Sequence, residues 1–150
     1  MIRFLIIIFL LITVLIPSYA KTNKGMKYLQ AEEYTKAIQE FSKTQDKEGL
    51  ISAYAKLGEK NFKDKEYGKA ANNYRSALFY TPNNQEIQNA LRNCEKKLKF
   101  KNTPKNHYYT AKLLEVAGEE AAAKYEYSKA AKYIKTLEKN ENKDNSTRKD

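Results

Sequence analysis

The sequence predicts an all-α fold, a short α-solenoid of about seven helices arranged in antiparallel pairs. Three observations predict it. A Tyr-x-Lys-Ala string recurs at 34–38, 67–71 and 127–131. In each copy a glycine lies twelve residues before the alanine, and a large apolar residue follows the alanine by four. Prolines number only three, and elsewhere apolar residues recur every three or four positions, which is the period of an amphipathic helix.

The helices follow in order from this periodicity and from the breaks between the apolar stripes. They are expected near 21–31, 34–46, 50–63, 67–80, 84–101, 105–122 and 125–139. Thr81-Pro82 should stop the fourth helix, because the residue before a proline avoids helical geometry. Thr103-Pro104 should start the sixth as N-cap and first-turn proline. Gly58 and Ala70 are expected where two antiparallel helices cross, since small residues let the backbones approach.

Composition by itself suggests that the chain is too poor in aliphatic residues to fold. Of the 130 residues after Ala20, only 18 are Leu, Ile, Val or Phe, and the formal net charge of the whole chain is +10. The repeat removes this objection, because such arrays build their interior from Ala, Gly and Tyr and bury each copy against its neighbours. Residues 139–150 contain no apolar side chain, so a disordered tail is expected there.

The first twenty residues have the parts of a secretory signal peptide. Arg3 gives a positive start, 4–16 is apolar except for one threonine, and Ser18 and Ala20 fill the two small positions of a cleavage site. Cleavage after Ala20 predicts a periplasmic or secreted protein, and an uncleaved membrane anchor is the alternative. Cys94 is the sole cysteine, so no internal disulfide can form, and it is interpreted as a small apolar helix residue.

These residues resemble the tetratricopeptide repeat (TPR) family, and the chain looks like an exported bacterial member of it. The repeat domain is expected over 21–138, with copies near 18–50, 51–84, a partial 85–101, and 111–138. The positions that carry the resemblance are Gly25, Tyr34, Ala37, Phe41, Tyr54, Leu57, Gly58, Tyr67, Ala70, Tyr74, Pro82, Gly118, Tyr127, Ala130 and Ile134.

The resemblance implies a protein–protein interaction adaptor that binds a peptide or protein partner in a concave groove. Family geometry places the groove on the first helix of each pair. The positions so implied are Ser52, Ala55, Glu59, Phe62, Lys63, Glu86, Asn89, Asn93, Lys96 and Lys97. The Lys-and-Asn clamp of the members that bind chaperone tails is not reproduced, since Thr22 and Met26 stand at its first positions. An acidic C-terminal tail is therefore not the implied ligand.

Catalytic chemistry finds little support in the sequence, so we expect neither an enzyme nor a cofactor or metal. His107 is the single histidine, which excludes sites with several histidines, and it is expected to be exposed and inert at a helix start. The five glycines stand singly rather than in a phosphate-binding loop.

The basic balance leaves two further hypotheses open. Lysines crowd one helix end, at Lys96, Lys97, Lys99, Lys101 and Lys105. With 24 Lys and only four Arg, specific nucleic-acid binding is not expected, because guanidinium groups dominate such recognition. The Lys96–Lys105 cluster could still attach the chain to an anionic membrane or envelope surface. The third reading is a pure spacer or assembly subunit.

Overall fold

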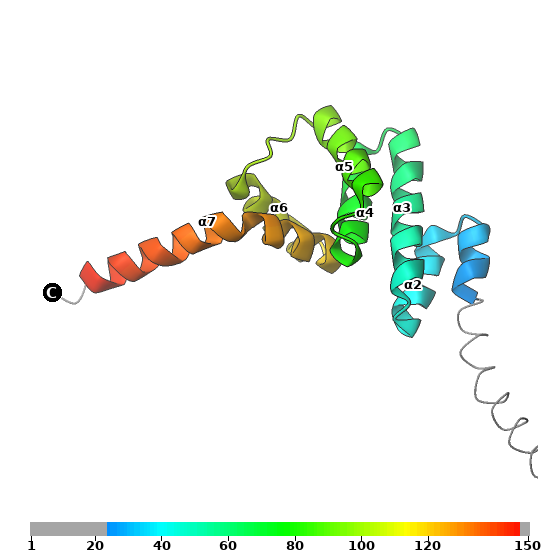
Figure 1. The fold of residues 1–150 in the computed structure, drawn as a ribbon, viewed down its shortest axis with the longest axis horizontal. Helices are drawn as coiled ribbons and strands as arrows, with labels where there is room; N and C mark the ends of the chain where they lie inside the picture. Colours follow the sequence, from blue (N-terminus) through cyan, green and yellow to red (C-terminus); the bar gives the residue numbers. More distant parts are fainter. Residues whose placement is uncertain (1–23, 148–150) are drawn as a thin grey trace, which may run out of the picture. The chain divides into compact units, whose positions relative to one another are not determined.

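The computed structural model describes residues 24–147, with side chains described up to residue 140, and this part of the chain is helical without a strand (Figure 1). Residues 24–30 are helical, and the further helices are α2 (Tyr34–Thr44), α3 (Lys47–Lys63), α4 (Tyr67–Tyr80), α5 (Gln85–Lys97), α6 (Pro104–Val116) and α7 (Glu120–Thr147). The predicted all-α class is confirmed. The predicted signal peptide at 1–20 lies outside the described residues.

Five helix ends share one backbone device, a residue in the left-handed region. These residues are Glu32, Gln45, Lys65, Lys99 and Gly118, with φ between 54° and 77°. After each of them the next amide donates to a carbonyl five residues back at 2.8–2.9 Å. This is the Schellman arrangement, which satisfies carbonyls that have no partner within the helix. The end of α4 is different, because Thr81 before Pro82 stops it as predicted.

The left-handed residues end two helices earlier than predicted. The fifth helix ends at Lys97 rather than 101, because the chain turns left-handed at Lys99. The sixth ends at Val116 rather than 122, because Gly118 takes φ 77°. Its predicted start is confirmed, since Thr103 Oγ1 accepts from the Asn106 amide at 3.2 Å with a proline in the first turn.

The last helix is longer than predicted at both ends. It begins at Glu120 instead of 125, directly after the glycine turn, and continues to Thr147 instead of 139. Residues 139–147 therefore belong to α7 rather than to the disordered tail that composition predicts. Lysine and glutamate are good helix formers and no glycine or proline interrupts this stretch, which permits the helix to continue.

The chain divides between Leu57 and Gly58 into two compact units, which are described separately. In the first unit, the fully buried Phe41 ring of α2 lies directly over two glycines. A Cβ atom on Gly25 would lie 2.5 Å from this ring, and one on Gly49 would also overlap it. Glycine is thus needed at both positions so that the neighbouring backbones can approach the ring.

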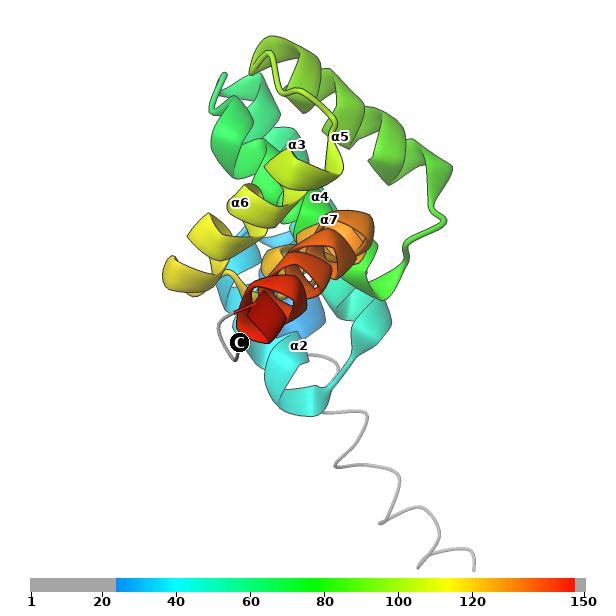
Figure 2. The same cartoon turned by 90° about the vertical axis from the view of Figure 1, so that its left-hand side faces the viewer.

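In the second unit α4 is the central helix. It packs against α5 on one side and against α7 on another, while α6 packs along α7. Figure 2 shows α7, in orange and red, beside the yellow α6 and in front of α4. The crossing predicted for Gly58 is confirmed, because a Cβ atom there would lie 2.7 Å from the Tyr74 ring.

The third copy of the string does not reproduce this crossing. Gly118 lies in the turn between α6 and α7 with positive φ, and a Cβ atom there would meet nothing within 4 Å. The contact between α6 and α7 is made instead by Leu114, Ala122 and Ala123, which form a buried cluster. Among residues 24–147 no helix combines the length and the apolar character that crossing a membrane requires.

Candidate functional site

A network of four buried charged or titratable side chains joins four parts of the second unit. Arg75 of α4 is 4% exposed and Glu126 of α7 is fully buried, although 51 residues separate them in the sequence. The Arg75 Nε donates to Glu126 Oε1. The Arg75 Nη2 also donates to Oε1 of Glu95 in α5, at 3.3 Å. A buried ion is strongly destabilising unless it is paired, so these contacts are what permits the burial.

His107 of α6 is the fourth member, and here the sequence interpretation was wrong. The side chain is buried rather than exposed, at 6%. Its Nδ1 lies 2.6 Å from Glu126 Oε2, and its Nε2 lies 2.8 Å from Asn102 Oδ1. The Glu126 carboxylate can only accept, so the Nδ1 of His107 donates to it, while the Nε2 faces the side-chain amide of Asn102.

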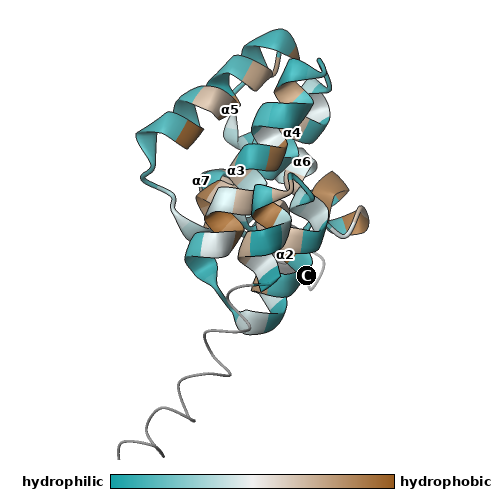
Figure 3. Cartoon of the chain, turned by 90° about the vertical axis from the view of Figure 1, so that its right-hand side faces the viewer, coloured by the Kyte–Doolittle hydropathy of each residue, from teal (hydrophilic) through white to brown (hydrophobic). Residues whose placement is uncertain are grey.

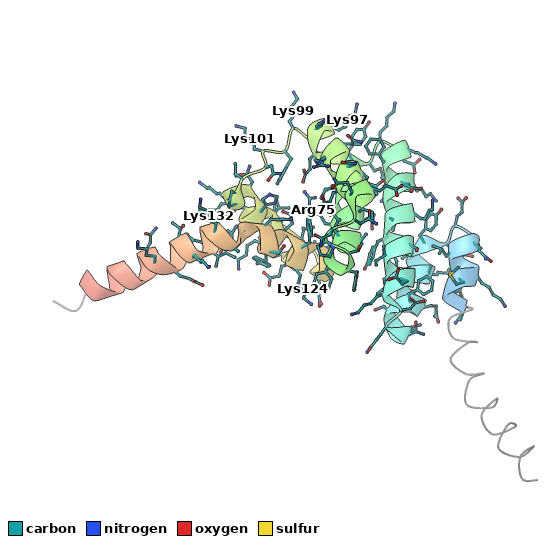
Figure 4. The ribbon with its side chains drawn as sticks, in the orientation of Figure 1. Arg75, Lys97, Lys99, Lys101, Lys124 and Lys132 are labelled. Carbon is teal, nitrogen blue, oxygen red and sulfur yellow. The ribbon has the colours of Figure 1, made fainter. Side chains whose placement is uncertain are left out.

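In this network the Arg75 guanidinium lies between two carboxylates, those of Glu95 and Glu126. The Phe100 ring covers the cluster, since its centroid lies 5.5 Å from the Arg75 guanidinium carbon and 5.5 Å from the His107 ring. Figure 4 shows the Arg75 side chain in the interior of this unit, whereas Lys97, Lys99 and Lys101 point outward.

Beside the network is a pocket of about 330 Å³, which we call the α5–α7 pocket. Its lining residues come from α5, the 98–103 segment, α6 and α7: Gln88, Leu91, Arg92, Glu95, Asn102, His107, Tyr125 and Lys129. Glu95 and His107 thus belong both to the network and to the pocket wall. Arg92 and Lys129 are exposed, so two cations stand where the pocket meets solvent.

Burial changes the acidity of two groups in the pocket wall. It raises the pKa of the Glu95 carboxyl, and the nearby Arg75 opposes this rise only in part. Burial also raises the pKa of the Tyr125 hydroxyl to about 12, with Glu126 and Glu95 adding to the effect. At neutral pH the Tyr125 hydroxyl therefore keeps its proton and can act as a hydrogen-bond donor.

The ten groove positions implied by the family resemblance lie elsewhere. Those on α5 are all exposed, Asn89 accepts a hydrogen bond from Arg92, and none of the ten lines the α5–α7 pocket. Of those on α3, Ser52 and Lys63 are exposed, and Phe62 is half-buried with its ring 5.2 Å from that of Tyr67. Ala55 and Glu59 are half-buried.

The network itself was missed by sequence reasoning, although the sequence holds a signal for it. Glu126 stands between Ala122 and Ala130 at intervals of four, on the buried stripe of α7. Arg75 occupies the same kind of position on α4, four residues after Ala71. A lone charge at a core position of each of two helices predicts that the two charges pair.

Comparison of the chain with protein-family models, with curated proteins and with solved structures gives no match. Within residues 24–147 no group of three or more His, Cys, Asp or Glu side chains is placed to hold a metal ion. The lone Cys94 is fully buried, and burial raises the pKa of its thiol to about 11. The arrangement is therefore that of an all-helical unit with a polar pocket beside a buried ion-pair network.

Proposed function

We propose that this chain is a non-catalytic interaction adaptor of TPR-like architecture, and that the α5–α7 pocket receives a peptide segment of its partner. Two glycine–aromatic crossings, Gly25 with Phe41 and Gly58 with Tyr74, recur at the 33-residue spacing of the family and support the architecture. Export to the bacterial cell envelope, as a periplasmic or secreted protein, rests on the 1–20 segment and belongs to the same proposal.

The observation that carries the proposal is the mixture of donors and acceptors in the pocket wall. A peptide group presents one N–H and one C=O, and both need partners once they leave water. Arg92 and Lys129 can donate to carbonyl oxygens at the mouth, while the Glu95 carboxylate accepts from an N–H further in. The buried network fixes the position of Glu95, so the site is organised before a peptide arrives.

A random-peptide display library tests this proposal. The chain as recovered from cells should enrich a family of peptides, and Arg92→Ala combined with Lys129→Ala should abolish the enrichment. The matched control is Lys96→Ala with Lys97→Ala, which removes the same charge from exposed positions outside the pocket and should leave enrichment intact. No enrichment, or enrichment that survives the loss of Arg92 and Lys129, contradicts the pocket as the binding site.

The same selection distinguishes the pocket from the groove that the family resemblance implies. Phe62→Ala combined with Asn93→Ala changes two of the implied groove positions and no pocket residue. If this pair abolishes capture while the Arg92 and Lys129 pair does not, the peptide binds on the implied groove face. Unchanged circular dichroism must accompany each variant, because Phe62 also contacts Tyr67.

A second candidate function is attachment to an anionic surface through the Lys96–Lys105 cluster. Its five lysines are all exposed, and none forms an ion pair with an acid in the part of the chain that the structure describes. Binding to vesicles that contain anionic lipid should weaken steeply as salt rises, because screening acts strongly on exposed charges. If Lys96, Lys97, Lys99 and Lys101 changed to Gln leave vesicle binding intact, this second function is rejected.

A further inference from the structure

Helix α6 carries an exposed apolar stripe, of which only Tyr109 also reaches α7, with its ring 6.4 Å from that of Tyr133. Its members are Tyr109, Leu113 and Val116, which are 52%, 73% and 89% exposed. Spacings of four and three residues place them on successive turns of one helix face. Figure 3 shows brown, hydrophobic turns at the C-terminal end of α6. Single exposed apolar residues are ordinary on protein surfaces, but a contiguous stripe marks a contact site.

Within the stripe, Leu113 and Val116 have no role in holding α6 to its own unit, whereas Tyr109 contacts Tyr133 of α7. His107, Ala111 and Leu114 form the buried side of this helix, and they pack toward α7 and the ion network. Leu113 and Val116 could be polar without any loss of these contacts. Their 4–3 spacing with Tyr109 is also that of a seam between two paired helices.

The charges near the two ends of α6 favour pairing with the α6 helix of a second copy in antiparallel orientation. Lys105 stands at the start of the helix beside the stripe, and Glu119 follows its end, both exposed. Two α6 helices paired antiparallel bring Lys105 of each copy near Glu119 of the other, so one attraction occurs twice. Their macrodipoles also oppose each other, which is favourable. A parallel pair would instead place like charges side by side.

Lys112 is the one stripe neighbour that this pairing does not favour, because the two copies of it meet near the symmetry axis. In its own chain Lys112 Nζ lies 3.9 Å from Glu115 Oε2. That carboxylate accompanies each Lys112 and reduces the repulsion between them.

We propose that the α6 stripe binds a second copy of this chain, with the two α6 helices antiparallel in a symmetric dimer. Three side chains from each copy form a small interface, so the dimer belongs to the weak, concentration-dependent class. None of the stripe residues lines the α5–α7 pocket, so the test of the dimer is independent of the test of peptide binding.

Sedimentation of the chain as recovered from cells, from low micromolar to near-millimolar concentration, tests the proposal. The mass should rise toward twice that of one chain as concentration rises. Leu113→Glu with Val116→Glu should keep the chain monomeric at every concentration, with unchanged helicity because both side chains are exposed. A wild-type chain that remains monomeric, or a dimer that these two changes do not weaken, overturns the proposal.

Charge reversal tests the antiparallel geometry in particular. Lys105→Glu alone and Glu119→Lys alone should each weaken the dimer by roughly tenfold, because the change acts twice across the symmetry axis. The double variant restores opposite charges and should recover wild-type association. Single variants without effect, or a double variant no better than the singles, exclude this pairing. If hydrogen exchange shows the stripe to be protected in a monomer, another segment of the same chain covers the stripe, and the dimer proposal is overturned.

Discussion

Gly58 lies where α3 passes the ring of Tyr74, and no other residue type fits there without a shift. The ring of Tyr74 is 4% exposed, and a methyl group on Gly58 would lie 2.7 Å from it. The neighbour is the body of an aromatic ring rather than the end of a flexible chain, so the ring or the helix must move. Close packing at this one residue sets how near its backbone lies to the Tyr74 ring.

We therefore expect Gly58→Ala to lower the free energy of unfolding by about 1–3 kcal/mol through overpacking. Gly68→Ala is the matched control, because a Cβ atom there meets nothing within 4 Å in the exposed first turn of α4. This control should be neutral or stabilising by up to roughly 1 kcal/mol, since alanine favours helix. Urea unfolding measures both, and equal effects at the two glycines would contradict the close approach.

Cys94 offers a second test at the residue scale. Burial raises the pKa of its thiol to about 11, so almost no thiolate is present at neutral pH. An aromatic disulfide reagent should modify the folded chain much more slowly than the urea-unfolded chain. A native thiol that reacts as fast as the unfolded one would show that this part of α5 is not packed.

At the scale of the helices, left-handed residues decide where the helices end. Glycine adopts positive φ without the steric penalty that a Cβ atom brings, yet only Gly118 among the five end residues is glycine. Lysine stands at Lys65 and Lys99. Each non-glycine end therefore carries a strain that the capping hydrogen bonds must outweigh.

Substitutions at these two kinds of helix end should change the stability of the fold in opposite directions. Gly118→Ala should destabilise the chain by roughly 1 kcal/mol, because alanine disfavours the left-handed region. Lys99→Gly should stabilise it slightly or leave it unchanged, because glycine relieves the same strain. Thermal unfolding followed by circular dichroism compares the two, and a destabilising Lys99→Gly would show that the lysine side chain itself supports the turn.

At the scale of the whole second unit, Glu126 is the residue on which the charged interior depends. One oxygen accepts from Arg75 and the other from His107. Glutamine has the same shape but only one acceptor oxygen, so in Glu126→Gln one of the two donors faces an NH₂ group. Removing one partner of a buried ion pair costs about 3–5 kcal/mol.

We expect Glu126→Gln to destabilise the folded chain by an amount of that order. Glu120→Gln on the first turn of the same helix is the control, because its side chain is 82% exposed and its pair with Lys124 is worth little. Chemical denaturation measures both variants. Equal small effects would mean that the interior network contributes no stability that depends on charge.

The pH dependence of stability follows from Glu95. Burial raises the pKa of its carboxyl, so the folded state holds this proton more tightly than the unfolded state does. The contribution of Glu95 to stability is therefore present below its ordinary pKa and is lost as pH rises through the raised value. The difference in unfolding free energy between wild type and Glu95→Gln should fall across this window. A difference that stays constant or grows with pH contradicts the raised pKa.

Much of the fold could be predicted from the sequence because the helical period is visible in the spacing of apolar residues within each segment. The all-helical class, the bounds of α4, the stop at Pro82 and the cap at Thr103 depend on neighbours within one turn, and all are confirmed. A close approach of neighbouring helices at Gly58 was also predicted from the small residues there, and the structure places the Tyr74 ring against it. The TPR resemblance, the adaptor function and export remain predictions.

Only the tertiary structure decided which polar residues form a site. Sequence alone put His107 on the surface, yet it lies between Glu126 and Asn102 in the interior. It also grouped Gly118 with the repeat glycines Gly25 and Gly58, whereas this glycine ends α6. The physical reason is the same in both cases. Local spacing determines which residues share a helix face, but whether a face meets a partner helix or water depends on segments that are distant in the chain.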